Sequence, residues 1–386
     1  MKGVLTMTER AGTLVQNLTG DAAYWSFRPS PLPPEPALTL DSDMRQMFVA
    51  TSRALTNLER LALLIPSTDL FIAMYVRKEA LLSSQIEGTQ CTLEDVLDPE
   101  LDTAANLDAG EVVNYVRAAQ FALERMQQLP LCNRLLRETH AVLMEGVRGE
   151  EKNPGEFRRS QNWIGPAGCG LKDARYIPPN VDDMTAALDD LEHYINTDTP
   201  YPPLIDAALI HYQFETIHPF LDGNGRIGRL LILLYFIEKS LLTKPVIYVS
   251  YFLKKNQLEY YDRISEVRRT GNYEQWIRFF LEAVNAAAID ATETIWSLSE
   301  LHNANLAQLP VSNRQPDNLR RLFDYIEAHP IITLRQTADA LALSYNTVAA
   351  GVKKLVALGI LQETTNASRN RVFAYEDYLA ILRQDT

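Results

Sequence analysis

The stretch HPFLDGNGRIGR, from His218 to Arg229, decides how the rest of this sequence is interpreted. It combines a histidine, a carboxylate, an asparagine, glycines and two arginines within twelve positions. These residue types are poor material for a hydrophobic core, but they are the groups that bind and transfer phosphate. The stretch therefore predicts a nucleotide site, which the surrounding sequence has to support.

Proline follows His218 directly, and a residue before proline is displaced from helical geometry. We expect a helix over residues 203–217 to end at His218 and to present the imidazole at the mouth of a loop. An imidazole titrates near neutrality and can accept a proton from an attacking hydroxyl. Asp222 supplies a single carboxylate, which suits Mg²⁺ because that ion takes most of its other ligands from phosphates and water.

The glycines of this stretch predict an anion-binding turn. Gly223 and Gly225 allow the backbone to turn its N–H groups inward, and the next helix, beginning within GNGR, adds free N–H donors at its N-terminus. Arg226 and Arg229 lie one turn apart and can hold two further phosphate groups with forked donors. Asn224 is expected either to donate to a phosphate oxygen or to support the loop.

Composition excludes several classes of protein. The chain has 386 residues, 46% of them hydrophobic, and a net charge of −12, which argues against a surface built for nonspecific nucleic-acid or membrane binding. Cys91, Cys132 and Cys169 are too few and too scattered for a disulfide framework or a zinc site. The N-terminus lacks the apolar core of a signal peptide, and no apolar run reaches the length of a membrane span. We expect a soluble, cytoplasmic protein.

The apolar spacing is mainly helical, and it divides the chain into four parts. Residues 1–104 form a helical N-terminal region in which 27–38 is an extended, proline-rich strap (a disordered tail is the alternative) and a helix at about 72–88 ends at Gly88. Residues 105–290 form the main helical domain, interrupted at about 157–178 by a glycine- and proline-bracketed stretch that predicts a small β-hairpin. Residues 291–316 are expected to be a helix end and linker.

Residues 317–386 predict three short helices followed by two strands around a polar turn, which is the order of a winged helix-turn-helix. This part carries eight basic and eight acidic side chains, so it is neutral while the rest is acidic. Lys353 and Lys354 on the expected recognition helix, with Arg369 and Arg371 on the wing, permit DNA binding through a local basic set. Contact with protein, including dimerisation, is the alternative, and it is slightly favoured.

The central stretch resembles the Fic family motif HxFx(D/E)GNGRxxR. Every specified position is matched, by His218, Phe220, Asp222, Gly223, Asn224, Gly225, Arg226 and Arg229. EVVNY before the motif, the flap-like stretch at 157–178 and EYYDRI after the motif extend the resemblance over roughly residues 105–290. It implies a mainly α, Fic-type catalytic domain that transfers AMP from ATP to a Ser, Thr or Tyr hydroxyl of a target protein or of itself, with release of pyrophosphate.

The resemblance also implies roles for individual residues. His218 would deprotonate the target hydroxyl, Asp222 would hold Mg²⁺ across the α- and β-phosphates, and Phe220 would anchor the loop in the core. The flap would pair with the backbone of the target as an added strand. The residues expected to bind ATP are Gly223, Asn224, Gly225, Arg226, Ile227, Gly228, Arg229 and Tyr261.

SSQIEG, residues 83–88, resembles the inhibitory motif (S/T)xxxE(G/N) of Fic proteins that restrain their own activity. Ser83 and Glu87 are four residues apart and therefore share one helical face. Glu87 would pair with Arg229 and take the place of the γ-phosphate. The motif is common by itself, and the alternative is that Glu87 is an ordinary surface acid at a helix end. Because a complete Fic motif is also present in the chain, the inhibitory role is favoured.

Two other functions stay open. A transcriptional regulator could use the Fic domain to sense a nucleotide, and a Fic-type phosphotransferase would transfer the γ-phosphate instead of AMP. Family variants that transfer other groups usually depart from the full motif, so the complete match favours AMP transfer. The target protein is not identified by the sequence, and a homodimer is an expectation that rests on relatives alone.

Overall fold

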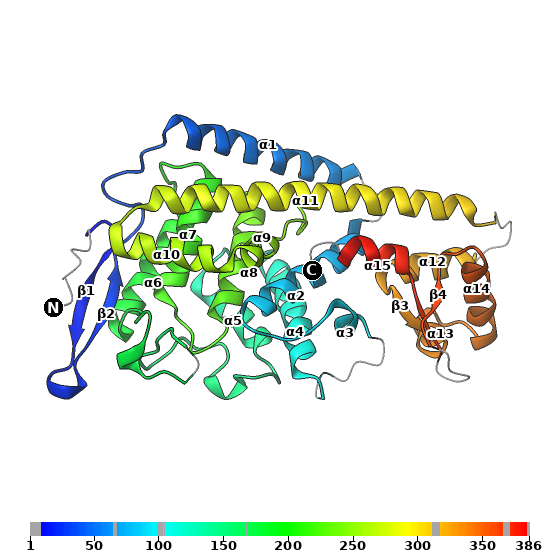
Figure 1. Ribbon diagram of the computed structural model, residues 1–386, viewed down its shortest axis with the longest axis horizontal. Helices are drawn as coiled ribbons and strands as arrows, with labels where there is room; N and C mark the ends of the chain where they lie inside the picture. Colours follow the sequence, from blue (N-terminus) through cyan, green and yellow to red (C-terminus); the bar gives the residue numbers. More distant parts are fainter. Residues whose placement is uncertain are drawn as a thin grey trace.

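Two long helices lie side by side along one edge of the molecule (Figure 1). In this computed structural model, which describes residues 9–64, 68–98, 103, 105–166, 168–310, 317–365 and 371–383, they are α1 (Ser42–Leu64) and α11 (Tyr273–Gln308). Buried alanines at Ala283, Ala287, Ala288 and Ala291 bring α11 close to its neighbours. The pair covers the helices that carry the candidate site.

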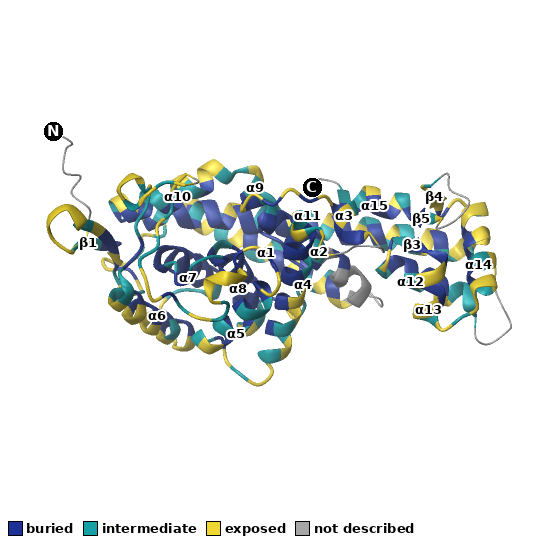
Figure 2. Cartoon of the chain, turned by 90° about the horizontal axis from the view of Figure 1, so that it is seen from below, coloured by how far each residue is buried: buried dark blue, intermediate teal, exposed yellow. Residues whose placement is uncertain are grey.

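The central helices are α7 (Pro203–Ile217) and α8 (Asn224–Glu238), which pack against each other. Their sequences are apolar on all sides instead of along one stripe, which is typical of helices enclosed by others. Figure 2 shows buried residues along both of them. They are surrounded by α2 (Thr68–Ile86), α4 (Leu107–Arg125), α5 (Asn133–Leu143), α6 (Val181–Asn196), α9 (Ser250–Lys255) and α10 (Gln257–Thr270).

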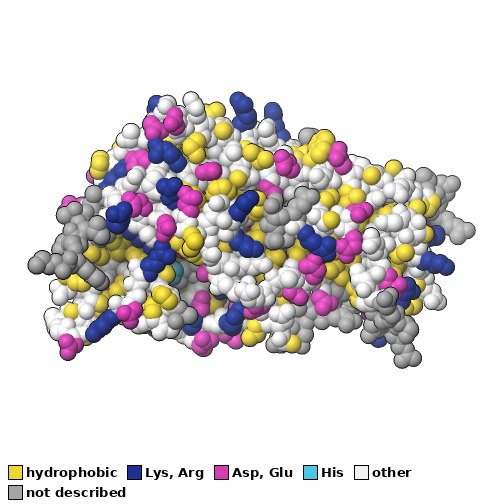
Figure 3. All heavy atoms as spheres, viewed as in Figure 1, with side chains coloured by type: hydrophobic (Ala, Val, Ile, Leu, Met, Phe, Trp, Pro, Cys, Tyr) yellow, Lys and Arg dark blue, Asp and Glu magenta, His cyan; other side chains and the backbone are white. Residues whose placement is uncertain are grey.

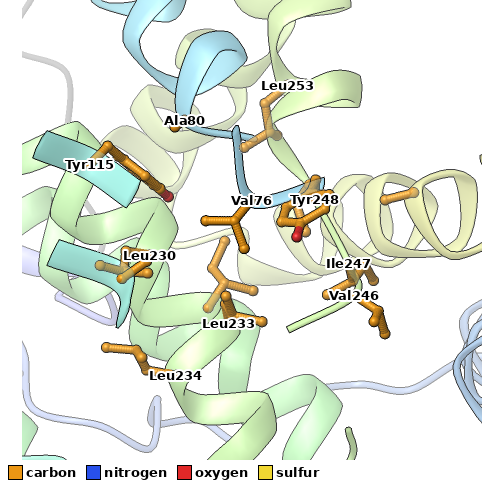
Figure 4. Close-up of a cluster of buried hydrophobic side chains, with 14 of the residues drawn as sticks. Val76, Ala80, Tyr115, Leu230, Leu233, Leu234, Val246, Ile247, Tyr248 and Leu253 are labelled. Atoms are coloured by element: carbon orange, nitrogen blue, oxygen red, sulfur yellow. The ribbon is translucent and has the colours of Figure 1, made fainter. Parts of the chain in front are cut away.

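Helix α2 is fixed to this core along its middle. Val76 and Ala80 of α2 lie in an apolar cluster with Tyr115 of α4 and Leu233 of α8 (Figure 4). The helix ends at Ile86, and Gly88 follows with φ 97°, a left-handed conformation that only glycine adopts without strain. Ser83 and Glu87 are therefore held at the end of α2 that faces α8. The short helix α3 (Leu93–Leu97) follows.

The N-terminal part begins with a β-hairpin that the sequence did not predict. Strand β1 (Gly12–Asn17) pairs antiparallel with β2 (Tyr24–Pro29), joined through a 3₁₀ turn at Gly20–Ala22. The expected strap over 27–38 is therefore wrong for Phe27 to Pro29, and the region 1–104 is not entirely helical. The backbone N–H of Phe27 donates to the carbonyl of Ile177 at 2.9 Å, so the hairpin is docked against the stretch expected to form the flap.

The expected flap forms only a minimal hairpin. Ile164 and Tyr176 make a single antiparallel bridge, in which the Ile164 N–H donates to the Tyr176 carbonyl at 2.9 Å and the Tyr176 N–H donates back at 3.0 Å. A 3₁₀ turn lies between them at Leu171–Asp173. The predicted pairing is present, but the glycines and prolines on either side stop it from extending into longer strands among the described residues.

Helix α11 continues to Gln308, through most of the stretch that was expected to be helix end and linker; residues 311–316 lie outside the described part. After this stretch come α12 (Asn318–Ala328), β3 (Ile331–Thr333), α13 (Leu334–Leu341), α14 (Tyr345–Ala357), β4 (Gln362–Glu363), β5 (Val372–Ala374) and α15 (Glu376–Arg383). The three strands form one sheet in the order β3-β5-β4. The expected helices and strands are present in order; the winged-helix assignment stays a prediction.

The C-terminal part is packed onto the helical domain. Helix α12 contacts α2, and α15 contacts α11. Arg383 of α15 donates to Glu94 of α3 at 2.5 Å. Cys91, Cys132 and Cys169 are free thiols. Within the part of the chain that the structure describes, no helix is both long and apolar enough to cross a lipid bilayer.

Candidate active site

The loop between α7 and α8 is tightly shaped. His218 closes α7 in a left-handed conformation with φ 51°, and its N–H donates to the Phe214 carbonyl at 3.0 Å. Gly223 precedes α8 with φ 72°, again left-handed. The proline after His218 explains why α7 stops there, as the sequence predicted. A non-glycine residue in this conformation needs support from its surroundings.

Asn224 provides part of that support. Its side-chain oxygen accepts from the Phe220 N–H at 2.8 Å, and its side-chain nitrogen donates to the Phe220 carbonyl at 2.8 Å. Phe220 itself is fully buried and stacks on His140 with ring centroids 3.8 Å apart. Of the two roles expected for the Asn224 side chain, the structure shows the supporting one, because both ends of the amide are already bonded.

Two residues of the flap also support the loop between α7 and α8 through hydrogen bonds that the sequence did not predict. Arg158 donates from Nε to the His218 carbonyl at 3.0 Å, and its backbone N–H donates to the Pro219 carbonyl at 2.8 Å. The Asn162 side chain donates to the carbonyls of His218 at 3.2 Å and Phe220 at 2.9 Å. The base of the flap and the catalytic loop are thereby joined into one hydrogen-bonded unit.

A cavity of about 670 Å³ lies over the N-terminus of α8, within the roughly 300–1,000 Å³ typical of ligand pockets. It brings together six of the residues predicted from the sequence: Glu87, His218, Asp222, Gly225, Arg229 and Tyr261. The flap contributes Trp163, Ile164 and Tyr176, and α10 adds Tyr260, Ile264 and Arg268. On one face of the molecule, a histidine side chain is visible in a recess beside Lys or Arg side chains (Figure 3).

The remaining residues predicted to bind ATP do not line this cavity. They are Gly223, Asn224, Arg226, Ile227 and Gly228. Ile227 is buried in the core with 1% of its surface exposed. In α8, the N–H of Ile227 is the first that donates to a carbonyl of the preceding loop. The N–H groups that come before it in the helix are therefore the ones available to an anion.

Arg226 points away from the cavity and is incompletely bonded. Its Nη1 lies 3.6 Å from a Glu111 carboxylate oxygen, and its Nη2 lies 3.5 Å from the Met144 sulfur. Nε and Nη1 have no hydrogen-bond partner among the described residues, although the side chain is buried. A buried guanidinium with unused donors is suited to an anion, which supports phosphate binding near this helix end.

Arg229 is held by Ser83 and Glu87, the two residues of the predicted inhibitory motif, which is called the brake below. Its Nε donates to the Ser83 hydroxyl at 2.8 Å, and its Nη2 donates to the Ser83 carbonyl at 2.8 Å and to Glu87 Oε1 at 2.7 Å. Burial works against the charged form, but the Glu87 carboxylate raises the pKa of Arg229 above its usual value. The Arg229 side chain is 1% exposed, whereas that of Glu87 is 37% exposed.

The Glu87 carboxylate also covers the N-terminus of α8. A Cβ added to Gly225 would lie 2.1 Å from Glu87 Oε1 and 2.9 Å from an Arg229 nitrogen. Only glycine leaves room for an acidic group this close to the helix backbone. A carboxylate of the same chain therefore lies against Gly225 in the first turn of α8, where it is bonded to Arg229.

Asp222 is paired with a lysine that the sequence did not single out. Lys152, from the 3₁₀ turn Glu150–Lys152, places Nζ 2.6 Å from Asp222 Oδ2, and the Gly223 N–H donates to Oδ1 at 2.7 Å. Burial works to raise the pKa of Asp222, but Lys152 and the Gly223 N–H hold it below its usual value. Among the described residues no group of three or more metal-ligating side chains exists. The donor set therefore suits Mg²⁺ only if phosphate and water supply its other ligands.

His218 is electrically neutral in this setting. Burial and, to a smaller extent, the neighbouring cations Arg268 and Arg158 lower its pKa to about 3. Its Nδ1 is buried without a hydrogen-bond partner among the described residues. A neutral imidazole is the form that can accept a proton, as a general base requires.

Glu215 is a cavity residue that the sequence did not predict. It lies in the last turn of α7, three residues before His218, and burial raises its pKa to about 7. The sequence feature that could have predicted Glu215 is an acid in the otherwise uncharged last turn of a buried helix. No such feature marks Arg158 or Lys152, because their partners lie 60 and 70 residues away in sequence.

The fold and the cavity together define a mainly helical protein with a cavity over a helix N-terminus beside a neutral histidine. Residues 46–124 match the family model for the Fic/DOC family N-terminal region, and residues 130–236 match the model for the Fic/DOC family itself. Over these two ranges the chain is similar to the Fic/DOC family.

Curated relatives carry the description protein adenylyltransferase Fic. The chain is 31% identical over 149 residues to the one from Aedes aegypti and 30% identical over the same length to the one from Drosophila grimshawi. Each match covers 38% of this chain but only 26% and 27% of the relatives, so the chain spans about a quarter of their length.

Solved structures agree with the helical fold. A Fic family protein from Desulfovibrio desulfuricans superposes with a TM-score of 0.54 at 20% identity, covering 88% of this chain and 97% of that one. A Fic domain-containing signaling protein from Bacteroides thetaiotaomicron superposes with a TM-score of 0.51 at 20% identity, covering 65% of this chain and 98% of the other. At this identity the likeness concerns the fold alone.

Proposed function

We propose that this chain is a protein adenylyltransferase that transfers AMP from ATP to a protein hydroxyl and is restrained by Glu87. The observation that carries the proposal is the cavity in which a neutral His218 faces the N-terminus of α8 and Arg229. Helix N-terminus, arginine and base are the parts that phosphoryl transfer needs for positioning and charge stabilisation. The description of the curated relatives supports the same reaction.

In the proposed reaction, His218 accepts the proton of a Ser, Thr or Tyr hydroxyl on the target. The oxygen of that hydroxyl forms a bond to the α-phosphorus, the bond between the α- and β-phosphates breaks, and pyrophosphate leaves. The first N–H groups of α8 hold the negative charge that develops on the phosphate oxygens. Asp222 would hold a Mg²⁺ ion, which supplies charge neutralisation at the phosphates.

ATP binding is expected to strengthen the base. The pKa of His218 is lowered first by burial and then by the cations Arg268 and Arg158. A triphosphate in the same cavity brings negative charge that offsets those cations and therefore raises the pKa of His218. The histidine becomes a better proton acceptor only when the nucleotide is present.

Glu87 is proposed to act as the brake because its carboxylate already occupies the anion position over Gly225 and is bonded to Arg229. A triphosphate that reaches Arg229 has to displace it. The Ser83 hydroxyl accepts from Nε of the same guanidinium, and the Ser83 carbonyl shares Nη2 with Glu87. The signal that moves Glu87 and the identity of the target protein are separate from this geometry.

Label transfer tests the proposed reaction. The Glu87→Gly variant is incubated with Mg²⁺ and with ATP labelled at either the α- or the γ-phosphate, and its intact mass is recorded. The proposal expects α-label in protein and a mass increase of one AMP. Transfer of γ-label indicates a phosphotransferase, and binding without transfer indicates a nucleotide sensor. The matched control, Glu87→Gly with His218→Ala, is expected to transfer neither label.

For the C-terminal part we favour a protein-contact role over DNA binding. Arg371, one of the expected wing cations, is paired with Glu363 through Nε at 2.6 Å, and Arg369 lies outside the described residues. A local basic set on this part is therefore partly neutralised. A salt-dependent shift of duplex DNA by the full chain would contradict this assignment, and sedimentation of the same sample measures whether the predicted homodimer forms.

A further inference from the structure

Glu215 is a buried acid that the proposed reaction does not use. It lines the cavity together with Glu87 and Arg229. Its Oε1 is buried and has no hydrogen-bond partner among the described residues. An unpartnered, desolvated carboxylate oxygen costs free energy, so this position is suited to a proton or to a ligand that supplies one.

Two glycines place Glu215 beside the brake. A Cβ on Gly228 would lie 2.2 Å from Glu215 Oε1, just as a Cβ on Gly225 would lie 2.1 Å from Glu87 Oε1. Residues three apart on a helix are neighbours, separated by about 5–6 Å. The two carboxylates therefore stand one turn apart on the same face of α8, and Arg229 is bonded to only one of them, Glu87, among the described contacts.

The charges around Glu215 are mixed. The net effect raises its pKa to about 7: burial raises it most, Arg229 of α8 lowers it, Glu87 just after α2 raises it and Arg268 of α10 lowers it. Arg268 donates to the backbone carbonyl of Glu215 at 3.0 Å. The other titratable groups that face this part of the cavity are His218, Tyr260 and Tyr261. Near neutral pH, Glu215 is therefore close to the midpoint of its own titration.

A triphosphate that replaces Glu87 brings more negative charge to a point one turn from Glu215. An ionised Glu215 would repel it and would weaken the attraction that Arg229 and Arg268 exert on the phosphate. A neutral carboxylic acid removes that repulsion and offers an O–H donor to a phosphate oxygen. Given the proposed function, we propose that Glu215 binds the nucleotide as a neutral acid, donating a hydrogen bond to the terminal phosphate that replaces Glu87.

Proton uptake on binding tests this proposal. The ligand is α,β-methylene ATP with Mg²⁺, in which the bond that AMP transfer would break is blocked. Calorimetry at pH 8 in buffers of different ionisation enthalpy measures the protons bound. The Glu87→Gly protein is expected to take up a proton, and Glu87→Gly with Glu215→Gln is expected to take up less, because an amide donates without titrating.

The affinity should depend on pH in the same way. With a pKa of at most about 7, the neutral fraction of Glu215 falls by at least about tenfold between pH 6 and pH 8, and the apparent affinity falls with it. The Glu215→Gln protein should show a smaller fall. The pH series on Glu87→Gly alone keeps the test informative if the second substitution disturbs folding.

Two control variants separate other titrating groups. His218→Ala, in the Glu87→Gly background, removes the proton that phosphate could bring onto the imidazole and should retain the uptake due to Glu215. Asp324→Asn changes an exposed acid that pairs with Arg320 at 2.7 Å within α12, outside the cavity, and should change neither measurement.

The outcomes that would overturn the proposal differ from those that overturn the proposed function. Equal proton uptake and equal pH dependence with and without Glu215→Gln would show that Glu215 stays ionised, while nucleotide binding stands. Equal Glu215-dependent uptake with AMP, which lacks the terminal phosphate, would also contradict it. Failure of all the proteins to bind the nucleotide would remove the proposed function and this inference together.

Discussion

Replacement of Glu87 by glycine should strengthen binding of a triphosphate by about tenfold. In the structure the Glu87 carboxylate is 2.7 Å from an Arg229 nitrogen and covers Gly225, so a γ-phosphate has to break this contact before it reaches Arg229. A charge-assisted hydrogen bond contributes about 1.5–3 kcal/mol. Because Glu87 is 37% exposed, solvent screening favours the lower end, and about 1.4 kcal/mol corresponds to tenfold in affinity.

The measurement is the dissociation constant of Mg²⁺ with α,β-methylene ATP, determined by calorimetry for the original protein and for Glu87→Gly. AMP provides the internal control, since it has no γ-phosphate to compete with Glu87 and its affinity should change by less than about twofold, well below 1 kcal/mol. Because Glu87→Gly also removes an ion-pair partner from the buried Arg229, the melting temperature should fall, and the affinities are compared well below it. Glu87→Gln keeps the volume and loses the charge, and it should give a smaller gain.

Equal affinity of the original protein and Glu87→Gly for the triphosphate would refute this account of the brake. An equal gain for AMP and for the triphosphate would also refute it, because the carboxylate would then block the whole cavity and not the terminal phosphate alone.

Three further changes test the remaining parts of the site. His218→Ala should lower the rate of AMP transfer by about 10²–10⁴-fold with little change in nucleotide affinity, measured by α-label incorporation at saturating ATP in the Glu87→Gly background. Asp222→Asn should raise the Mg²⁺ concentration needed for half-maximal transfer. Lys152→Met frees Asp222 from an exposed ion pair worth less than about 1 kcal/mol, so it should lower that concentration a few-fold in the same titration. Asn224→Ala should lower the free energy of unfolding by about 1–3 kcal/mol in a denaturant titration, because it leaves the buried N–H of Phe220 unpaired and its carbonyl with Asn162 alone; an unchanged midpoint would contradict the supporting role.

Local sequence patterns predicted the course of the chain at two points of the cavity. The proline after His218 ended α7 where expected, and Ser83 and Glu87, four residues apart, both contact Arg229. Helical periodicity and the effect of proline on the preceding residue depend on residues that are close in sequence, so both can be recognised in a single sequence. The partner of Glu87, 142 residues away, came from the family resemblance and not from periodicity.

Side-chain partners across the fold were less predictable. Arg226 has the same residue type as Arg229 and lies one turn before it, yet it turns toward Glu111 and Met144 and leaves the cavity. Lys152 reaches Asp222 only because the turn at residues 150–152 is packed beside the loop. The N-terminal hairpin was missed because its strands are stabilised by each other and by Ile177, which no pattern within residues 9–29 reveals.

The bonds from Arg158 and Asn162 to the carbonyl of His218 limit which part of the stretch 157–178 can be exchanged for that of a relative. A foreign segment that replaced either side chain would remove support from the left-handed backbone conformation of His218. The part that can be replaced is therefore the one between Asn162 and Tyr176, and a chimera confined to it should keep the backbone of the His218 loop unchanged.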